Sequence, residues 1–296
     1  MSQSPAAVSI IIVSADSGAG LRECVARALA SSVPVEIILV DNASSDGVPQ
    51  ALARDHANDP RVRMMFSDAN LGFGPAVNRG AKLARADALL ILNPDCLLET
   101  TTAAQLLDAN RASANAGVIG AIVCDANGTP DPASHRRDPL LRRSLMTLSG
   151  FARHEKKNPN YAGVNVPGPM PGATVAVENV SGALMLVPRD VFEKLGGFDE
   201  NYFLHCEDLD LCRRARDAGF QVLLAGNVRV LHGKGGSSRH RPVFVSRHKH
   251  RGMWRWFRKF DPAARNPFAR AAVWCGIWLH FAATAPLLTM RKRNHL

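Results

Sequence analysis

Short hydrophobic runs that alternate with helix-like segments are the feature that most constrains this chain. Each run in the first 124 residues is followed by a polar turn and then by apolar residues at helical spacing. Runs that are almost entirely apolar, such as residues 8–13, are typical of strands buried on both faces of a parallel sheet. The alternation therefore predicts an α/β fold with a mainly parallel central sheet flanked by helices. The expected strands are residues 8–13, 35–40, 61–66, 88–92 and 117–123, and the expected helices are about 21–29, 46–57, 75–86 and 100–114.

Residues 125–174 interrupt this alternation. The segment is rich in Pro, Gly, Asn and basic residues, with one amphipathic turn at 140–151. We interpret it as an insertion that is either a mobile segment over the functional face or a surface loop without a special role. Regular structure is expected again at 175–187, 189–195 (helix), from about Cys206 (acidic helix), 220–225 and 228–232.

Polar residues follow two of the expected strands at the points where the strands end. Asp41 comes after the second strand, and Asn93-Pro94-Asp95 follows the fourth. Ligands of open α/β sheets bind at the carboxyl ends of the strands, so these residues are candidates for ligand binding. Taken singly, each motif also fits an ordinary turn.

The carboxylates Glu207 and Asp208 open the acidic helix, shortly after a segment at 196–200 that reads Gly-Gly-Phe-Asp-Glu. The helix dipole favours acids near a helix N-terminus, which is sufficient reason for Asp210. It does not account for the aromatic, Gly-rich turn upstream. We therefore expect Glu207 and Asp208 to take part in the reaction of an active site.

Two other ligand classes are disfavoured by spacing. The Gly-rich turn Asn70 to Asn78 looks like a dinucleotide fingerprint, but Val77 stands at the third glycine position and no Gly-x-Gly follows the first strand. A zinc site is disfavoured because Cys206 and Cys212 lie on different faces of a helix and no second pair completes a tetrahedral set.

The order and type of these motifs resemble the family 2 glycosyltransferases of the GT-A fold, and within them the bacterial rhamnosyltransferase-like group. The resemblance covers roughly residues 8–238 and includes the His-x-x-Gly-x-Ser pattern that begins at His232. It implies a GT-A (nucleotide-diphospho-sugar transferase) domain over 1–238 and a separate basic, hydrophobic helical tail over 239–296. Within the domain it implies a nucleotide-sugar-binding half (1–124), a mobile insertion over the acceptor side (125–174) and an acceptor and catalytic half (175–238).

The resemblance also implies a mechanism. Asp208 would take the proton from the attacking acceptor hydroxyl in a single displacement with inversion, and Glu207 would position the acceptor or the backbone. Asp95 and His232 would hold Mg²⁺ or Mn²⁺ together with the donor diphosphate. Asn93 replaces the first Asp of the family's metal motif, so most of the metal affinity would come from the diphosphate.

The same resemblance implies a set of donor-binding residues at the strand ends and in the Gly-rich turn. Asp41 would read the base, and Lys234 would add a phosphate contact. The aromatic residue that the family places after the first strand is missing at 13–17, so Ser14 would contact the base through its backbone. The expected set is Ser14, Asp41, Asn42, Asn70, Gly72, Asn78, Asn93, Ser181 and Gly182, the last two lining the sugar pocket.

Positive charge is concentrated at the end of the sequence. Residues 239–296 hold thirteen Lys and Arg and one acid, whereas the net charge of the whole chain is +10. This segment also carries Trp and Phe residues and an apolar stretch at 271–290. Basic residues beside an aromatic-edged apolar stretch suit an anionic membrane surface better than nucleic acid. Three arrangements remain open: a helix in the membrane interface, a membrane span, or a helix packed on the enzyme or on a dimer partner.

We therefore expect an inverting, metal-dependent hexosyltransferase that moves L-rhamnose from dTDP-L-rhamnose to a polyprenyl-diphosphate-linked saccharide. Its product would belong to O-antigen, lipopolysaccharide or another envelope polysaccharide. The expected location is the cytoplasmic face of the inner membrane, because no secretory signal is evident and the six cysteines form no regular framework. The alternatives are the same mechanism with a UDP-sugar, or a non-catalytic membrane adaptor. A sugar-1-phosphate nucleotidylyltransferase is disfavoured because residues 14–20 lack its basic Gly-rich loop.

Overall fold

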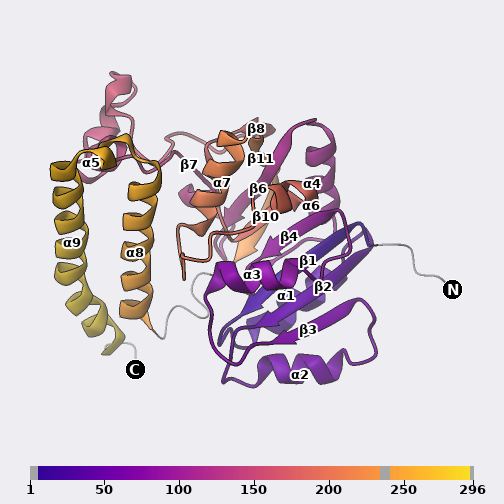
Figure 1. Cartoon of the computed structure of the whole chain (residues 1–296). Helices are drawn as coiled ribbons and strands as arrows, with labels where there is room; N and C mark the ends of the chain where they lie inside the picture. Colours follow the sequence, from indigo (N-terminus) through magenta and orange to yellow (C-terminus); the bar gives the residue numbers. More distant parts are fainter. Residues whose placement is uncertain (1–5, 234–240, 294–296) are drawn as a thin grey trace.

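The computed structural model of the chain describes residues 6–233 and 241–293. Lys234, for which the sequence suggests a phosphate contact, lies outside the described residues. Figure 1 shows a central sheet with helices on both faces and two long helices beside it, α8 (Pro242–Phe260) and α9 (Pro267–Arg293).

Nine strands of the described chain form one mixed sheet, in the order β3-β2-β1-β4-β10-β6-β11-β5, with β8 paired to β11. The neighbours β3, β2, β1 and β4 are parallel, as are β6 and β11, whereas β10 lies antiparallel between β4 and β6. The predicted fold class is confirmed. The bounds are β1 Val8–Ser14, β2 Val35–Asp41, β3 Val62–Phe66, β4 Ala88–Leu92, β5 Cys96–Leu97, β6 Ala116–Cys124, β8 Thr174–Ala176, β10 Leu184–Pro188 and β11 Gln221–His232.

The apolar runs form strands because each strand has a hydrophobic layer on both faces. In β1, Ile10 and Ile12 belong to one layer, while Ile11 and Val13 belong to the other. The first layer is completed by α1 (Gly20–Leu29), α2 (Val48–Asp55) and α4 (Thr102–Arg111), and the second by α3 (Phe73–Ala81), α6 (Arg189–Lys194) and α7 (Glu207–Asp217).

Three helices and one strand differ from the sequence-based expectation, and the helix expected over 100–114 covers Thr102–Arg111. The helix expected over 46–57 covers only Val48–Asp55, and the one expected over 75–86 covers Phe73–Ala81. After Ala81 the backbone tightens, with hydrogen bonds from Leu83 N to Gly80 O and from Ala84 N to Ala81 O. The two short strands expected at 220–225 and 228–232 join into β11, with a register irregularity between Ala225 and Arg229.

The insertion at 125–174 is attached to α7. The buried carboxylate of Asp138 accepts hydrogen bonds from Arg213 (3.1 Å) and Arg216 (2.6 Å), which both lie on α7. The short strand β7 (His135–Arg136) pairs with β9 (Asn179–Val180). The insertion also contains α5 (Leu141–Leu148) and the 3₁₀ turns Pro132–Ser134, Phe151–His154 and Pro159–Tyr161.

Helix α8 packs on the body of the protein through Trp256. This side chain is 1% exposed and lies in a hydrophobic cluster with Tyr202, Cys206 and Leu209 at the start of α7. The α8 helix is therefore part of the folded body, although the sequence assigns residues 239–296 to a separate tail.

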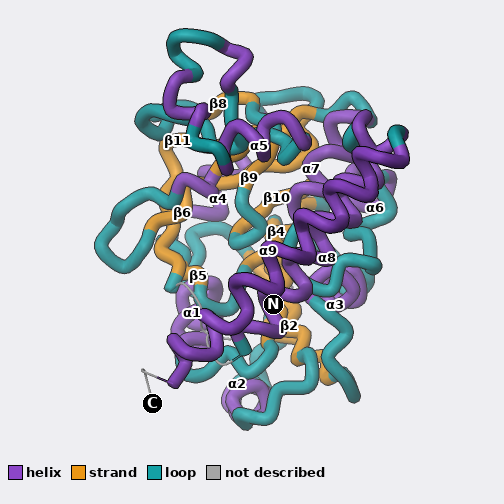
Figure 2. The backbone as a smooth tube through the Cα atoms, turned by 90° about the vertical axis from the view of Figure 1, so that its left-hand side faces the viewer, coloured by secondary structure: helices purple, strands orange, loops and turns teal. Residues whose placement is uncertain are grey.

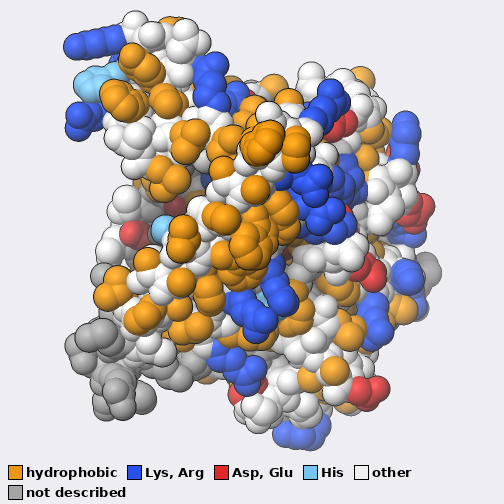
Figure 3. All heavy atoms as spheres, turned by 60° about the vertical axis from the view of Figure 1, so that its left-hand side comes forward, with side chains coloured by type: hydrophobic (Ala, Val, Ile, Leu, Met, Phe, Trp, Pro, Cys, Tyr) orange, Lys and Arg blue, Asp and Glu red, His pale blue; other side chains and the backbone are white. Residues whose placement is uncertain are grey.

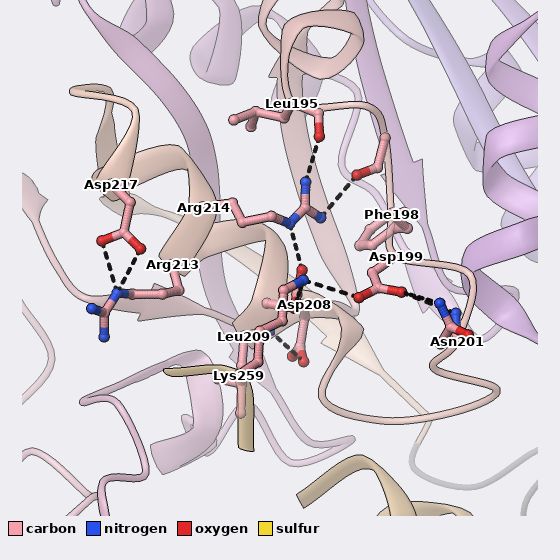
Figure 4. Close-up of polar contacts among 12 residues, drawn as sticks. Leu195, Phe198, Asp199, Asn201, Asp208, Leu209, Arg213, Arg214, Asp217 and Lys259 are labelled. Carbon is pink, nitrogen blue, oxygen red and sulfur yellow. Dashed lines mark hydrogen bonds and ion pairs between the residues drawn. The ribbon is translucent and has the colours of Figure 1, made fainter. Parts of the chain in front are cut away.

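Ion pairs reinforce the attachment of α8. Asp199 accepts hydrogen bonds from Arg255 (2.7 Å) and Lys259 (2.9 Å), and Lys259 also reaches Asp210 (2.6 Å). Figure 4 shows Lys259 and Asp199 beside the first turn of α7. Burial opposes ionisation of Asp199, but the hydrogen bonds from Asn201, Arg255 and Lys259 outweigh it and hold the pKa of this carboxyl below its ordinary value.

Helix α9 runs beside α8, as the views in Figures 1 and 2 agree. The ring of His250 on α8 lies 2.9 Å from that of His280 on α9 (Nε2 to Nδ1). Residues Pro267–Thr289 are long and apolar enough to cross a membrane by length and composition, and none of the most apolar window of this stretch is buried in the protein. One face of α9 thus contacts α8 while apolar side chains elsewhere on it remain exposed.

The position of Trp256 makes a prediction about stability. Trp256→Ala should lower the free energy of unfolding by about 3–5 kcal/mol, because it leaves a cavity between α8 and α7. Trp274→Ala is the matched control, since Trp274 is 49% exposed on α9, and it should change stability by less than about 0.5 kcal/mol. Urea denaturation measures both values. Equal effects of the two substitutions would contradict the packing of α8 on the body.

Candidate active site

The carboxyl ends of β1 and β2 form a polar edge. Asp41, the last residue of β2, is almost fully buried, and its Oδ1 accepts a hydrogen bond from the Ser44 N–H (3.0 Å). Ser14, the last residue of β1, is also buried. Asp16 has a left-handed backbone (φ 54°) and accepts a hydrogen bond from the Ser45 hydroxyl (2.9 Å). These contacts hold together the two turns at which the sequence predicts the nucleotide base.

Asn42 shapes the Gly-rich turn beside this edge. Its Nδ2 donates to Asn70 Oδ1 (2.9 Å) and to Gly72 O (3.0 Å), and its Oδ1 accepts from the Leu71 N–H (2.9 Å). Gly72 has φ 94°, and a Cβ there would lie 2.6 Å from the Phe203 carbonyl oxygen. The turn lies directly against the loop that precedes α7, and because of this close approach only glycine fits at position 72.

Asn78 has a partner inside the protein. Its Oδ1 accepts from the Phe198 N–H (2.8 Å), and its Nδ2 donates to Phe198 O (2.9 Å) and to Glu200 Oε1 (3.0 Å). Both amide hydrogens are thus used in clamping the turn at 197–200. That Asn78 contacts the sugar nucleotide stays a prediction. Donation of an Asn78 N–H to that ligand would require one of these hydrogen bonds to break.

Asp95 and His232 form a second polar group, just after the end of β4, the strand next to β1. Strand β5 pairs with the end of β11, with Cys96 opposite His232. This register places Asp95 Oδ1 3.0 Å from His232 Nε2, and Asn93 Nδ2 lies 3.3 Å from the same nitrogen. Residues 139 positions apart in the sequence are therefore brought into one polar group.

This group fits a divalent cation that has further ligands from a substrate. Carboxylate oxygen and imidazole nitrogen are suitable ligands for Mg²⁺ and Mn²⁺. Two such side chains leave most coordination positions open, and among the described residues no group of three or more His, Cys, Asp and Glu could hold a metal ion by itself. A donor diphosphate would complete the site.

Asp208 lies at the first turn of α7, against the end of the loop before β10. Its Oδ2 accepts a hydrogen bond from the Gly182 N–H (3.1 Å) and lies 3.3 Å from Arg136 Nη2. A Cβ at Gly182 would lie 3.0 Å from the Asp208 Cβ, so a side chain at this position would press against Asp208. The neighbouring Ser181 accepts a hydrogen bond from the Ala183 N–H through its Oγ (3.3 Å).

The backbone before Asp208 is strained. His205 (φ 69°) and Cys206 (φ 71°) are two consecutive non-glycine residues in the left-handed region. Each such residue costs of the order of 1–3 kcal/mol and persists only where the surroundings enforce it. Burial lowers the pKa of His205 to about 4, so the imidazole is neutral near pH 7. The left-handed turn at His205 and Cys206 sets the direction in which the chain enters α7 and so the positions of Glu207 and Asp208.

Glu207 is buried next to Asp208. Its Oε2 has no hydrogen-bond partner among the described residues. Burial and the neighbouring Asp208 carboxylate raise the pKa of Glu207 well above its ordinary value. A group held toward its neutral form is suited to donating a hydrogen bond rather than to removing a proton.

Arg136 is a residue of this site that the sequence analysis did not single out. It stands in the irregular insertion among several other basic residues, where no periodicity marks it. Pairing of β7 with β9, directly before Gly182, places it beside Asp208.

The comparisons with known proteins identify the family of the chain. Residues 9–172 match the model of "Glycosyl transferase family 2". The chain is 31% identical over 259 residues to an N-acetylglucosaminyl-diphospho-decaprenol L-rhamnosyltransferase of Mycobacterium tuberculosis, covering 77% of this chain and 79% of that protein. It is 28% identical over 235 residues to the O-antigen biosynthesis protein RfbC of Myxococcus xanthus, covering 78% of this chain and 18% of that protein.

Solved structures share the fold. A mannosyltransferase from Pyrobaculum calidifontis, in complex with GDP-Man and Mn²⁺, has a TM-score of 0.61 at 16% identity and covers 97% of this chain and 74% of that one. GalNAc-T7 with UDP, GalNAc and Mn²⁺ has a TM-score of 0.62 at 16% identity and covers 91% and 52%. The protein is a glycosyltransferase: the chain belongs to glycosyl transferase family 2 and has the GT-A fold.

Proposed function

We propose that this enzyme transfers L-rhamnose from dTDP-L-rhamnose, with inversion, to a saccharide carried on a polyprenyl diphosphate. The observation that carries the proposal is the placement of the buried Asp208 carboxylate against Gly182. The similarity to an L-rhamnosyltransferase whose name specifies a decaprenyl-diphosphate substrate supports the sugar and the acceptor class.

The proposed reaction needs one base. Asp208 takes the proton from the acceptor hydroxyl, whose oxygen then bonds to the anomeric carbon from the face opposite the nucleotide. The bond between the anomeric carbon and the β-phosphate oxygen breaks, and the nucleoside diphosphate leaves. Glu207, held toward its neutral form, donates a hydrogen bond in the site and leaves the proton transfer to Asp208.

The donor would lie between the two polar groups at the sheet edge. Asp41 and the turns fastened by Asn42 and Asp16 would hold the nucleoside. Asp95 and His232 would hold Mg²⁺ or Mn²⁺, which when bound would neutralise charge on the leaving diphosphate. Asn93 stays within hydrogen-bond reach of His232 and orients its ring.

The proposed location is the cytoplasmic face of the membrane, with α9 lying in the interface. Figure 3 shows hydrophobic side chains gathered on the face formed by α8 and α9, with Lys and Arg at the edges. Phe268 is 83% and Leu279 70% exposed. The apolar outward face of α9 is unfavourable in water unless another apolar surface covers it. An anionic lipid surface would cover this face and would attract the surrounding Lys and Arg residues.

Donor identity is tested by ligand-induced stabilisation and turnover. With Mn²⁺ present, dTDP should raise the melting temperature more than UDP or GDP does, and only dTDP-L-rhamnose should be consumed when acceptor is added. A preference for UDP would replace the donor but keep the mechanism.

Asp208→Asn should bind dTDP as the wild type does and transfer sugar about 10²–10⁴-fold more slowly. Full turnover by this variant would exclude Asp208 as the base.

The contact between Gly182 and Asp208 gives a second test of the base. In Gly182→Ala the new methyl group displaces the carboxylate, so kcat should fall about ten- to hundredfold while dTDP affinity is unchanged. Gly20→Ala is the matched control, because a Cβ at Gly20 meets nothing within 4 Å. Wild-type kcat in Gly182→Ala would be inconsistent with a catalytic role for this contact.

Membrane attachment is tested by sedimentation with lipid vesicles. Leu279→Glu and Phe268→Glu should each weaken binding to anionic vesicles by about tenfold or more, because burying such a side chain is worth about 1.5–3 kcal/mol. Phe66→Glu serves as the control, since Phe66 is 49% exposed at the end of β3. If α9 instead covers a dimer partner, the substitutions will change the oligomeric state and leave vesicle binding as it was.

A further inference from the structure

Two basic side chains from different elements flank the acidic start of α7. Arg136 comes from β7 in the insertion, and its Nη2 lies 3.3 Å from Asp208 Oδ2. Lys249 comes from α8, which packs on the loop at 205–206: a Cβ at Gly252, one turn further along α8, would lie 2.7 Å from the His205 carbonyl oxygen. Burial lowers the pKa of His205, and the charge of Lys249 adds to this effect. Arg136 contributes in the same direction at His205. The two cations therefore act on one small region.

Arg136 is poorly satisfied compared with the arginine next to it. Its Nε is buried without a hydrogen-bond partner among the described residues. Arg137, in contrast, binds both carboxylate oxygens of Glu155 (2.9 and 3.1 Å) and the Gly163 carbonyl (3.0 Å). Arg137 thus fixes the fold of the insertion, whereas the side chain of Arg136 contacts one carboxylate, that of Asp208, and stays 29% exposed.

The charge around Asp208 favours an anion. Arg136 lies 3.3 Å from Asp208, and the acidic neighbour Glu207 is held toward its neutral form. The guanidinium of Arg136 presents a planar pair of donors that matches phosphate oxygens, and the exposed Lys249 adds a second point charge. Two separate cations suit two linked phosphates better than a single carboxylate.

We propose that Arg136 and Lys249 bind the diphosphate of the lipid-linked acceptor and thereby place its terminal sugar at Asp208. This inference rests on the proposed function, which supplies an acceptor that carries a diphosphate. Lys249 lies on the helix that packs beside α9, so the phosphates would enter from the side where the apolar helix face is exposed. The lipid chain would then continue toward the membrane.

The binding experiment uses geranyl diphosphate as the probe. Titration calorimetry is done on the full chain with dTDP and Mn²⁺ at saturation, so that the donor site is filled. Arg136→Gln should weaken binding at least tenfold and Lys249→Gln several-fold, whereas Arg136→Lys should lose less than Arg136→Gln. Arg142→Gln is the matched control, because Arg142 is an exposed arginine of the same insertion, and it should bind as the wild type does. No binding to the wild type, or equal binding by Arg136→Gln, overturns the proposal.

An activity experiment separates this site from a purely structural role. The same saccharide is offered once as an alkyl diphosphate and once as an alkyl glycoside without phosphate. Arg136→Gln and Lys249→Gln should raise KM for the diphosphate acceptor about tenfold and raise KM for the glycoside much less. Equal losses with both acceptors would overturn the diphosphate site. If the wild-type enzyme glycosylates neither acceptor, the proposed function fails, while the calorimetric result still decides whether the two cations bind a diphosphate.

Discussion

The left-handed backbone at His205 and Cys206 is the constraint on which the active site depends. These residues end the loop from Gly197 and start α7 in the direction that brings Asp208 to Gly182. Their strain is of the order of 1–3 kcal/mol each. The surrounding structure has to supply this energy.

Helix α8 supplies much of the support. Its Gly252 packs so closely on the loop that a Cβ there would lie 2.7 Å from the His205 carbonyl oxygen and 3.3 Å from Cys206 Sγ. Trp256 fills the space beside Cys206, and Arg255 and Lys259 are paired with carboxylates on both sides of the loop. The basic segment that looks like a membrane tail in the sequence is therefore also part of the scaffold around Asp208. Any membrane contact made through α9 would be one helix away from this loop.

Much of the fold follows from local sequence. The run at Val8–Ser14 predicts a strand because both of its faces are buried, and an acidic pair after a Gly-rich turn predicts a helix N-terminus at Glu207. In both cases the decisive interaction lies within a few residues or in a repeating pattern.

The remainder depends on contacts between distant residues. Asn78 fits a donor-site motif, but its amide is used by Phe198, 120 positions away. Trp256 and Trp274 look alike in the sequence, and only the docking of α8 makes one of them buried and the other exposed. Arg136 acquires its place beside Asp208 through the short pairing of β7 with β9, which an irregular segment does not reveal.

The most direct test of the account is the anomeric configuration of the product. With Asp208 as the one base in an in-line displacement, sugar from a donor of known configuration should appear in the product with the opposite configuration, as seen in the one-bond C1–H1 coupling by NMR. Product that retains the donor configuration would require a different arrangement of catalytic groups and would contradict the mechanism.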